Sequence, residues 1–213
     1  MVSVARVEQA LHARRDPPDD PLGVAPPVPV EQLPEEWRLR HESGLRAAAV
    51  LVLLLGDPED PRVLLTERAH HLQHHPGQVS FPGGRVEPHD TSLAMTALRE
   101  ANEEVGLAID AVDVFGYLPT QWTVSGYAMT PVVGYAPTAA LPDAWALDAQ
   151  EVASAFEVPA AFLFHTGNHR ESWREFQGVR FANTEIDWEG RHIWGVTARV
   201  ISQISRIISD EYR

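Results

Sequence analysis

Three glutamates lie close together in the middle of the chain, at Glu100, Glu103 and Glu104. Residues three and four apart share one face of a helix, so the three side chains form a single acidic patch. Like charges at these spacings destabilise a helix by roughly 0.2–0.5 kcal/mol per pair, and acids in a last turn oppose the helix dipole. Hard divalent cations such as Mg²⁺ and Mn²⁺ prefer oxygen ligands and would remove that cost. Three glutamates alone favour a solvated helix end, but an upstream glycine turn and the adjacent Arg99 favour a metal site.

The glutamates belong to residues 81–107, which predict a tight glycine turn, a loop and one helix. Asp90, Thr91 or Ser92 can cap the start of the helix, and Gly106 can end it in a left-handed conformation. Apolar residues at three- and four-residue steps form one stripe: Ala94, Ala97, Leu98, Ala101 and Val105. The helix is therefore expected to pack on a core through this stripe, with the acidic patch beside it.

This stretch resembles the signature of the Nudix hydrolases, in which a glycine and a spaced acid precede R-E-x-x-E-E-x-G and an apolar residue. The matching residues are Gly84, Arg99, Glu100, Glu103, Glu104, Gly106 and Leu107. Asp90 stands where the family has a glutamate, and Arg99 follows it one residue later than usual. Because of this offset, the sequence predicts no role for Asp90 in the motif's chemistry, while the helix and its glutamates are unaffected.

A second segment, residues 64–84, resembles an additional motif of the coenzyme A pyrophosphatase branch of that family. The matching residues are Leu64, Leu65, Thr66, Arg68, Ala69, Gly77 and the run F-P-G-G from Phe81 to Gly84. Gln73 replaces an arginine of the motif, and neighbouring histidines could partly replace its charge. The two motifs cover about a fifth of the chain, and their joint match is more specific than either alone.

The resemblance implies a metal site and an arginine that supports it. Glu100, Glu103 and Glu104, with the backbone carbonyl of Gly84, would hold Mg²⁺ or Mn²⁺, which offsets diphosphate charge and lowers the pKa of a bound water. Arg99 would hold a glutamate in place through a charge-assisted hydrogen bond. The alternative for Arg99 is an ordinary surface pair with Glu103, four residues further along the helix.

Substrate contacts are expected from the residues before the helix. Arg68 and Arg85 are candidates for phosphate contacts, and an ordinary solvated role has equal weight for each. Phe81 and Gly83 belong to a turn in which the backbone can approach a diphosphate closely.

Two other groups of side chains are weaker candidates. Glu151 and Glu157 could supply a further metal ligand or a base, but the favoured interpretation is that both are plain surface acids. Residues 69–77 carry four histidines in an expected loop, where solvated or phosphate-facing side chains are favoured over a zinc site.

The implied reaction is hydrolysis of the diphosphate of coenzyme A, and of its thioesters or oxidised form as further substrates. The products would be 4′-phosphopantetheine and adenosine 3′,5′-bisphosphate. One alternative is a Nudix pyrophosphatase for NADH or ADP-ribose, against which residues 64–84 argue. Another is a non-catalytic nucleotide-binding domain. The three intact glutamates argue against it, since a domain that only binds nucleotides could replace them and avoid the repulsion between their charges.

The composition restricts the partners. The 213 residues carry a formal net charge of −13, which argues against nucleic-acid binding, and no apolar run is long enough to span a bilayer. No segment suits a signal peptide and there is no cysteine, so we expect a cytoplasmic protein whose metal ligands are oxygen or nitrogen atoms. A small-molecule substrate and a monomer or homodimer are expected.

The remaining periodicities predict an α/β fold, and the resemblance specifies an α/β/α sandwich with a central mixed sheet. Residues 1–43 are expected to form an N-terminal helix and a proline-rich arm, and residues 44–213 the Nudix hydrolase domain. Strands are expected at 46–55 and 62–67 as a hairpin, then at 112–118, 129–135 and 151–158, with two short strands within 171–181. Further helices are expected at 3–15, at 159–164 with Pro159 in the first helical position, and at 195–208.

Overall fold

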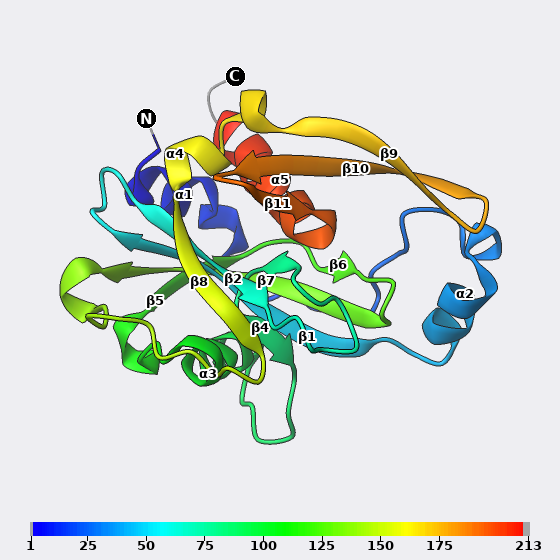
Figure 1. Cartoon of the computed structure of the whole chain (residues 1–213), viewed down its shortest axis with the longest axis horizontal. Coiled ribbons are helices and arrows are strands. Elements are labelled where there is room, and N and C mark those ends of the chain that lie inside the picture. The colour runs from blue at the N-terminus through cyan, green and yellow to red at the C-terminus, as the bar shows by residue number, and fades with distance from the viewer. Residues whose placement is uncertain (1, 211–213) are drawn as a thin grey trace.

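Within residues 2–210, the part of the chain that the computed structural model describes, eight strands form one mixed sheet (Figure 1). Its main path runs β3-β2-β1-β7-β5, while β4 pairs with β1, β6 with β7 and β8 with β2. The strands are β1 Arg46–Gly56, β2 Arg62–Arg68, β3 Val79–Ser80, β4 Gly83–Arg85, β5 Asp113–Tyr117, β6 Gln121–Trp122, β7 Tyr127–Pro137 and β8 Val152–Pro159. Strands β1 and β7 are parallel and the other pairs are antiparallel, which confirms the predicted mixed sheet and the β1–β2 hairpin.

Strand β1 is almost entirely apolar because helices cover both of its faces. Ala49, Leu51 and Leu53 pack in a cluster with the helix α3, Leu93–Val105. Val52 and Leu54 point to the opposite face and belong to the cluster that contains α5, Gly195–Asp210. Figure 1 shows α3 and α5 on opposite sides of the sheet, so the predicted α/β/α sandwich is confirmed.

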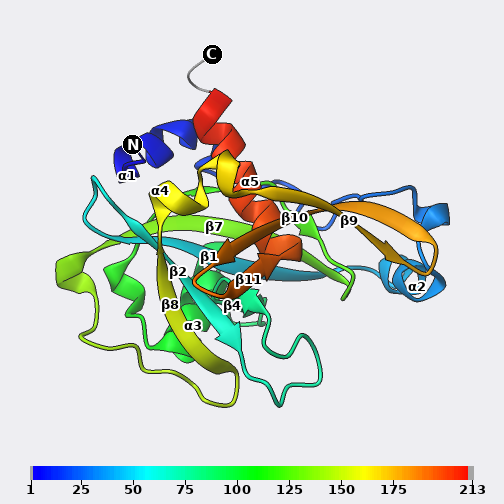
Figure 2. The same cartoon turned by 45° about the horizontal axis from the view of Figure 1, so that its top comes forward.

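A second, antiparallel sheet lies over α5 and has three strands in the described part of the chain (Figure 2). The strands are β9 Arg170–Phe176, β10 Val179–Trp188 and β11 Arg191–Trp194. A turn at Gln177-Gly178 joins the first two of these strands, with φ of 48° and 80° at the two residues. The prediction of two short strands within 171–181 was wrong in extent, because β10 continues to pair with β11 beyond the first hairpin.

The N-terminal residues pack on both sheets. Helix α1, Val4–Ala10, buries Val7 in the α5 cluster, and a 3₁₀ turn follows it at His12–Arg14. A helix that the sequence analysis did not anticipate, α2 Glu35–Glu42, buries Trp37 against Trp122. Its helical pattern is hard to see because Trp37 is the one residue of α2 that is buried.

A short helix follows β8 as expected, at α4 Ala160–Leu163. Pro159 is its N-cap and also the last residue of β8, rather than the first helical residue that was predicted. Among the described residues, no helix combines the length and the apolar content that crossing a bilayer requires.

Candidate active site

Helix α3 forms where the sequence predicts it, because both of its ends carry local signals. The side chain of Ser92 caps the start by accepting a hydrogen bond from the backbone N–H of Met95 at 3.1 Å. Gly106 ends the helix with φ of 73°, a left-handed conformation that suits glycine. Ser92 and Gly106 therefore define the length of the helix. The buried Ala97 and Ala101 define the face that packs against the sheet.

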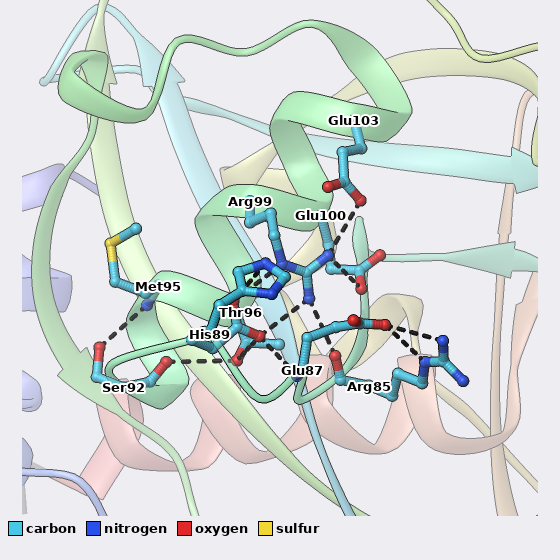
Figure 3. Close-up of polar contacts among 10 residues, drawn as sticks. Arg85, Glu87, His89, Ser92, Met95, Thr96, Arg99, Glu100 and Glu103 are labelled. Atoms are coloured by element: carbon cyan, nitrogen blue, oxygen red, sulfur yellow. Dashed lines mark hydrogen bonds and ion pairs between the residues drawn. The ribbon is translucent and has the colours of Figure 1, made fainter.

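Arg99 is the centre of the polar contacts on this helix (Figure 3). Its Nη1 donates to Glu100 Oε1 at 2.9 Å and to Glu103 Oε2 at 3.0 Å. Its Nη2 donates to the backbone carbonyl of Arg85 at 3.1 Å. The guanidinium therefore orients two of the three glutamates and attaches the helix to strand β4. Arg99 does more than pair with Glu103 on the surface, since only 14% of its side chain is exposed.

Asp90 holds Arg99 through two hydrogen bonds, although the sequence analysis assigned it no role. The distances from Arg99 Nε and Nη2 to the two oxygens of Asp90 are 2.9 and 3.0 Å, and 2% of the Asp90 side chain is exposed. The hydrogen bonds of Arg99 hold the pKa of Asp90 far below its usual range, and Asp90 raises the pKa of Arg99. Asp90 also accepts from Glu87 N–H at 2.8 Å and from Thr96 Oγ1 at 2.9 Å.

The one-residue offset in the motif is therefore accommodated in the loop before the helix. An aspartate is one methylene shorter than a glutamate, and the backbone contact to Glu87 fixes it in place. The sequence does carry a signal for Asp90, because it is an acid six positions after Gly84, where the motif has a glutamate. The later position of Arg99 hides this signal.

Two glycines allow strand β4 to lie against both β1 and the glutamates. These residues form a short strand, with Gly84 opposite Ala49, rather than the tight turn that was predicted. A Cβ on Gly83, where φ is 154°, would lie 2.5 Å from the Cα of Val50. A Cβ on Gly84 would lie 2.5 Å from the carboxylate of Glu100. A larger residue at position 84 would therefore displace that carboxylate.

Glu104 is the most deeply buried of the three glutamates, at 5% exposed. Burial, followed by the charges of Glu100 and Glu151, raises the pKa of Glu104 to about 8. Its Oε2 accepts a hydrogen bond from the N–H of Gly83 at 3.3 Å, which acts in the opposite direction. Burial also raises the pKa of Glu100, even though Arg99 lowers it. Two neighbouring carboxylates are thus held in surroundings that disfavour their charged forms.

This donor set fits a hard cation, although the side chains are not arranged around one. Within residues 2–210, no three histidine or acidic side chains are grouped as metal ligands. Glu100 and Glu103 face Arg99, and Glu104 faces the N–H of Gly83. Because the Glu103 side chain is 58% exposed, it can turn without disturbing the core. Burial and then repulsion between the acids raise the pKa values of Glu100 and Glu104, and a nearby cation would favour their charged forms. The cluster also offers the oxygen ligands that Mg²⁺ and Mn²⁺ prefer.

Arg68 lies beside the glutamate cluster, at the end of β2. Its charge lowers the pKa of Glu104 and also lowers that of His75, so it is close to both. Burial is the larger cause of the lowered pKa of His75. The backbone of Arg68 bonds to Gly77 and Gln78 and closes the histidine loop over this end of the sheet.

Two predicted substrate contacts are placed differently. Phe81 is 3% exposed and packs in the α5 cluster, so its side chain is part of the core. The guanidinium of Arg85 pairs with Glu87 at 2.8 Å and points away from the glutamates, while its carbonyl accepts from Arg99. Of the four predicted substrate contacts, Arg68 and Gly83 lie at the glutamate cluster. Arg68 acts on Glu104 through its charge, and Gly83 donates a hydrogen bond to it.

The two acids outside the motif have different surroundings. Glu151 raises the pKa values of both Glu100 and Glu104, and its backbone carbonyl accepts from the N–H of Ala69 at 2.8 Å. Its carboxylate is thus close enough to act on the cluster. Glu157 instead pairs with Arg62 on the surface, at 3.3 Å between Nε and Oε2.

Comparison of the sequence with known proteins identifies the family of this chain. A family model described as the NUDIX domain matches residues 45–179, more than half of the chain. The Nudix hydrolase NudL of Escherichia coli O7:K1, described as uncharacterized, is 41% identical over 170 residues, which are 78% of this chain and 84% of that protein. NudL of Salmonella paratyphi B is 39% identical over 173 residues, 79% of this chain and 86% of that one. The chain therefore belongs to the Nudix family of hydrolases, which act on nucleotide derivatives and generally use divalent metals.

Among solved structures, the Nudix hydrolase RenU from M. smegmatis aligns at 25% identity with a TM-score of 0.45. The alignment covers 55% of this chain and 71% of RenU.

Proposed function

We propose that this Nudix hydrolase cleaves the diphosphate of coenzyme A, yielding 4′-phosphopantetheine and adenosine 3′,5′-bisphosphate. The observation that carries the proposal is that residues 64–84, the segment that resembles the coenzyme A motif, lie beside the glutamates. Arg68 from this segment acts electrostatically on Glu104, and Gly83 at its end donates to the same carboxylate. These two interactions support a single site that includes both this segment and the glutamates. A chain without cysteine suits the reducing cytoplasm, where we place the reaction.

Glu100, Glu103, Glu104 and the carbonyl of Gly84 would hold Mg²⁺ or Mn²⁺ in this proposal. When bound, the cation supplies charge neutralisation of the diphosphate and a water of lowered pKa. The role of Arg99 is to orient Glu100 and Glu103, and Asp90 fixes Arg99 in turn. Glu104 must lose its proton to act as a ligand, which a cation favours because it replaces repulsion with attraction.

Arg68 supports a phosphate-binding role in two ways. A guanidinium can bind two phosphate oxygens at once, and this one lies beside the carboxylates that would hold the metal. The carboxylate of Glu151 lies at the same end of the sheet and could accept a proton from the attacking water. His75, beside Arg68, adds a further donor or acceptor close to the substrate.

Coenzyme A differs from ADP-ribose and NADH by its 3′-phosphate and its pantetheine arm. A site with a cation placed for the 3′-phosphate leaves that cation unpaired when the phosphate is missing, which lowers transition-state affinity. We expect kcat/KM for coenzyme A to exceed that for dephospho-coenzyme A and ADP-ribose by roughly tenfold or more, about 1.4 kcal/mol.

The experiment is a substrate panel at one Mg²⁺ concentration, with the products identified by mass spectrometry. The expected products of coenzyme A are the two named above, formed in equal amounts. Equal kcat/KM for coenzyme A and ADP-ribose would assign the chain to a broader nucleotide pyrophosphatase activity instead.

A further inference from the structure

A hollow of about 330 Å³ lies between α5, the β9–β10 hairpin and the proline-rich N-terminal segment. Its lining includes Val28, Trp173, Arg180, Phe181 and Arg199. Helices α5 and α3 cover opposite faces of the main sheet (Figure 1). The hollow is lined by Arg199 of α5, whereas the glutamates are on α3. A ligand of this hollow would therefore bind at a place distinct from the glutamate cluster.

Arg199 lines the hollow and has no partner among the described residues. Arg199 is half-buried on α5, and within the described residues it makes no hydrogen bond, ion pair or ring contact. Burial lowers its pKa, which reports the same loss of hydration. A partly desolvated cation without a counter-charge is unfavourable, and an anion in the hollow would compensate it.

The hairpin adds a second cation, Arg180, and a largely exposed aromatic side chain, Trp173, of which Arg180 covers one face. Trp173 is 63% exposed, which is unusual for so large an apolar side chain. The guanidinium carbon of Arg180 lies 4.7 Å from the centre of its ring. Glu175 lies opposite Arg180 in the strand register, but no ion pair joins them in the described part of the chain. The lining therefore holds two arginines and no acid, in a chain whose net charge is −13.

We infer that this hollow binds a nucleoside monophosphate, with the base stacked against the aromatic side chains and the phosphate between Arg180 and Arg199. A planar base is the partner that an exposed indole stacks on, and stacking of this kind contributes roughly 1–3 kcal/mol per base. Two guanidinium groups match the oxygens of a phosphate through charge-assisted hydrogen bonds. Inorganic phosphate would satisfy the arginines and leave Trp173 exposed, so the aromatic surface favours the nucleotide.

The test is isothermal titration calorimetry of the full chain with AMP in excess EDTA, which removes metal-dependent binding at the glutamates. The matched pair of variants is Arg199→Met and Arg206→Met, because Arg206 is an exposed arginine on the same helix. We expect the parent and Arg206→Met to bind AMP equally, and Arg199→Met and Trp173→Ala to bind at least tenfold more weakly. Arg199→Lys, which keeps the charge without the planar fork, should be intermediate.

Absence of AMP binding to the parent, or equal binding by Arg199→Met, would overturn the inference. Inorganic phosphate that binds as tightly as AMP would also overturn it, because the aromatic surface would then contribute nothing. A loss of AMP binding in Glu104→Gln would place the nucleotide in the hydrolytic site instead. Melting temperatures of all variants separate a binding defect from misfolding, and the Arg199→Lys variant keeps the test decisive if Arg199→Met does not fold.

Discussion

Replacing Glu104 by glutamine tests whether this buried carboxylate is kept for function at the expense of stability. Its pKa rises from an ordinary value of 4.5 to about 8 on folding. The folded state therefore binds the proton more tightly than the unfolded state, so the free energy of unfolding falls as the pH rises from about 4.5 to 8. At one pKa unit per 1.36 kcal/mol, this group removes about 3 kcal/mol between pH 4 and pH 7. Glutamine cannot ionise and has no such penalty.

Urea unfolding of parent and Glu104→Gln, in EDTA at several pH values, measures this difference. We expect the variant to become more stable than the parent as the pH rises, by about 3 kcal/mol at pH 7 relative to pH 4. The control is Glu103→Gln, which removes a charge from an exposed side chain and should change stability by less than about 1 kcal/mol at any pH. Parallel pH curves for parent and Glu104→Gln would refute the argument from burial, whereas turnover close to the parental rate would remove Glu104 from the catalytic group.

The remaining predictions concern the metal and the support of Arg99. The clustered oxygen ligands predict no turnover of coenzyme A in excess chelator and recovery on adding Mg²⁺ or Mn²⁺; full activity in chelator, with metal content checked, contradicts this. Asp90→Asn removes the charge of a carboxylate that is 2% exposed and paired with Arg99, which should lower the free energy of unfolding at pH 7 by on the order of 3 kcal/mol. Because the pKa of Asp90 is lowered in the folded state, this contribution is fully present above the pKa of an unfolded aspartate, declines below it and is lost only as the pH falls through the lowered pKa of folded Asp90. Urea unfolding of the parent and Asp90→Asn at pH 7 and at a series of lower pH values should show a deficit that shrinks below the unfolded pKa, and a deficit that stays constant over the series would show that the charge of Asp90 is not what stabilises the fold.

The sequence by itself determined the helix that carries the glutamates and the strand on which it packs. Ser92, Gly106 and the apolar stripe between them are local signals, because a helix end depends on residues a few positions away. The long apolar run of β1 likewise predicts a strand covered on both faces. The family resemblance then predicted Arg99 and the three glutamates as the chemical group.

The surroundings of Asp90, Glu104 and Arg199 depended on the tertiary fold. Asp90 reaches Arg99 across a loop whose length the motif does not predict. The raised pKa of Glu104 comes from burial and from Glu151, which lies 47 positions further along the chain. Short elements such as α2 and β11 escaped prediction because few of their residues are buried. Hydrogen bonding along a helix is local and can be read from neighbouring residues, whereas burial and charge repulsion arise only when the tertiary fold brings distant residues together.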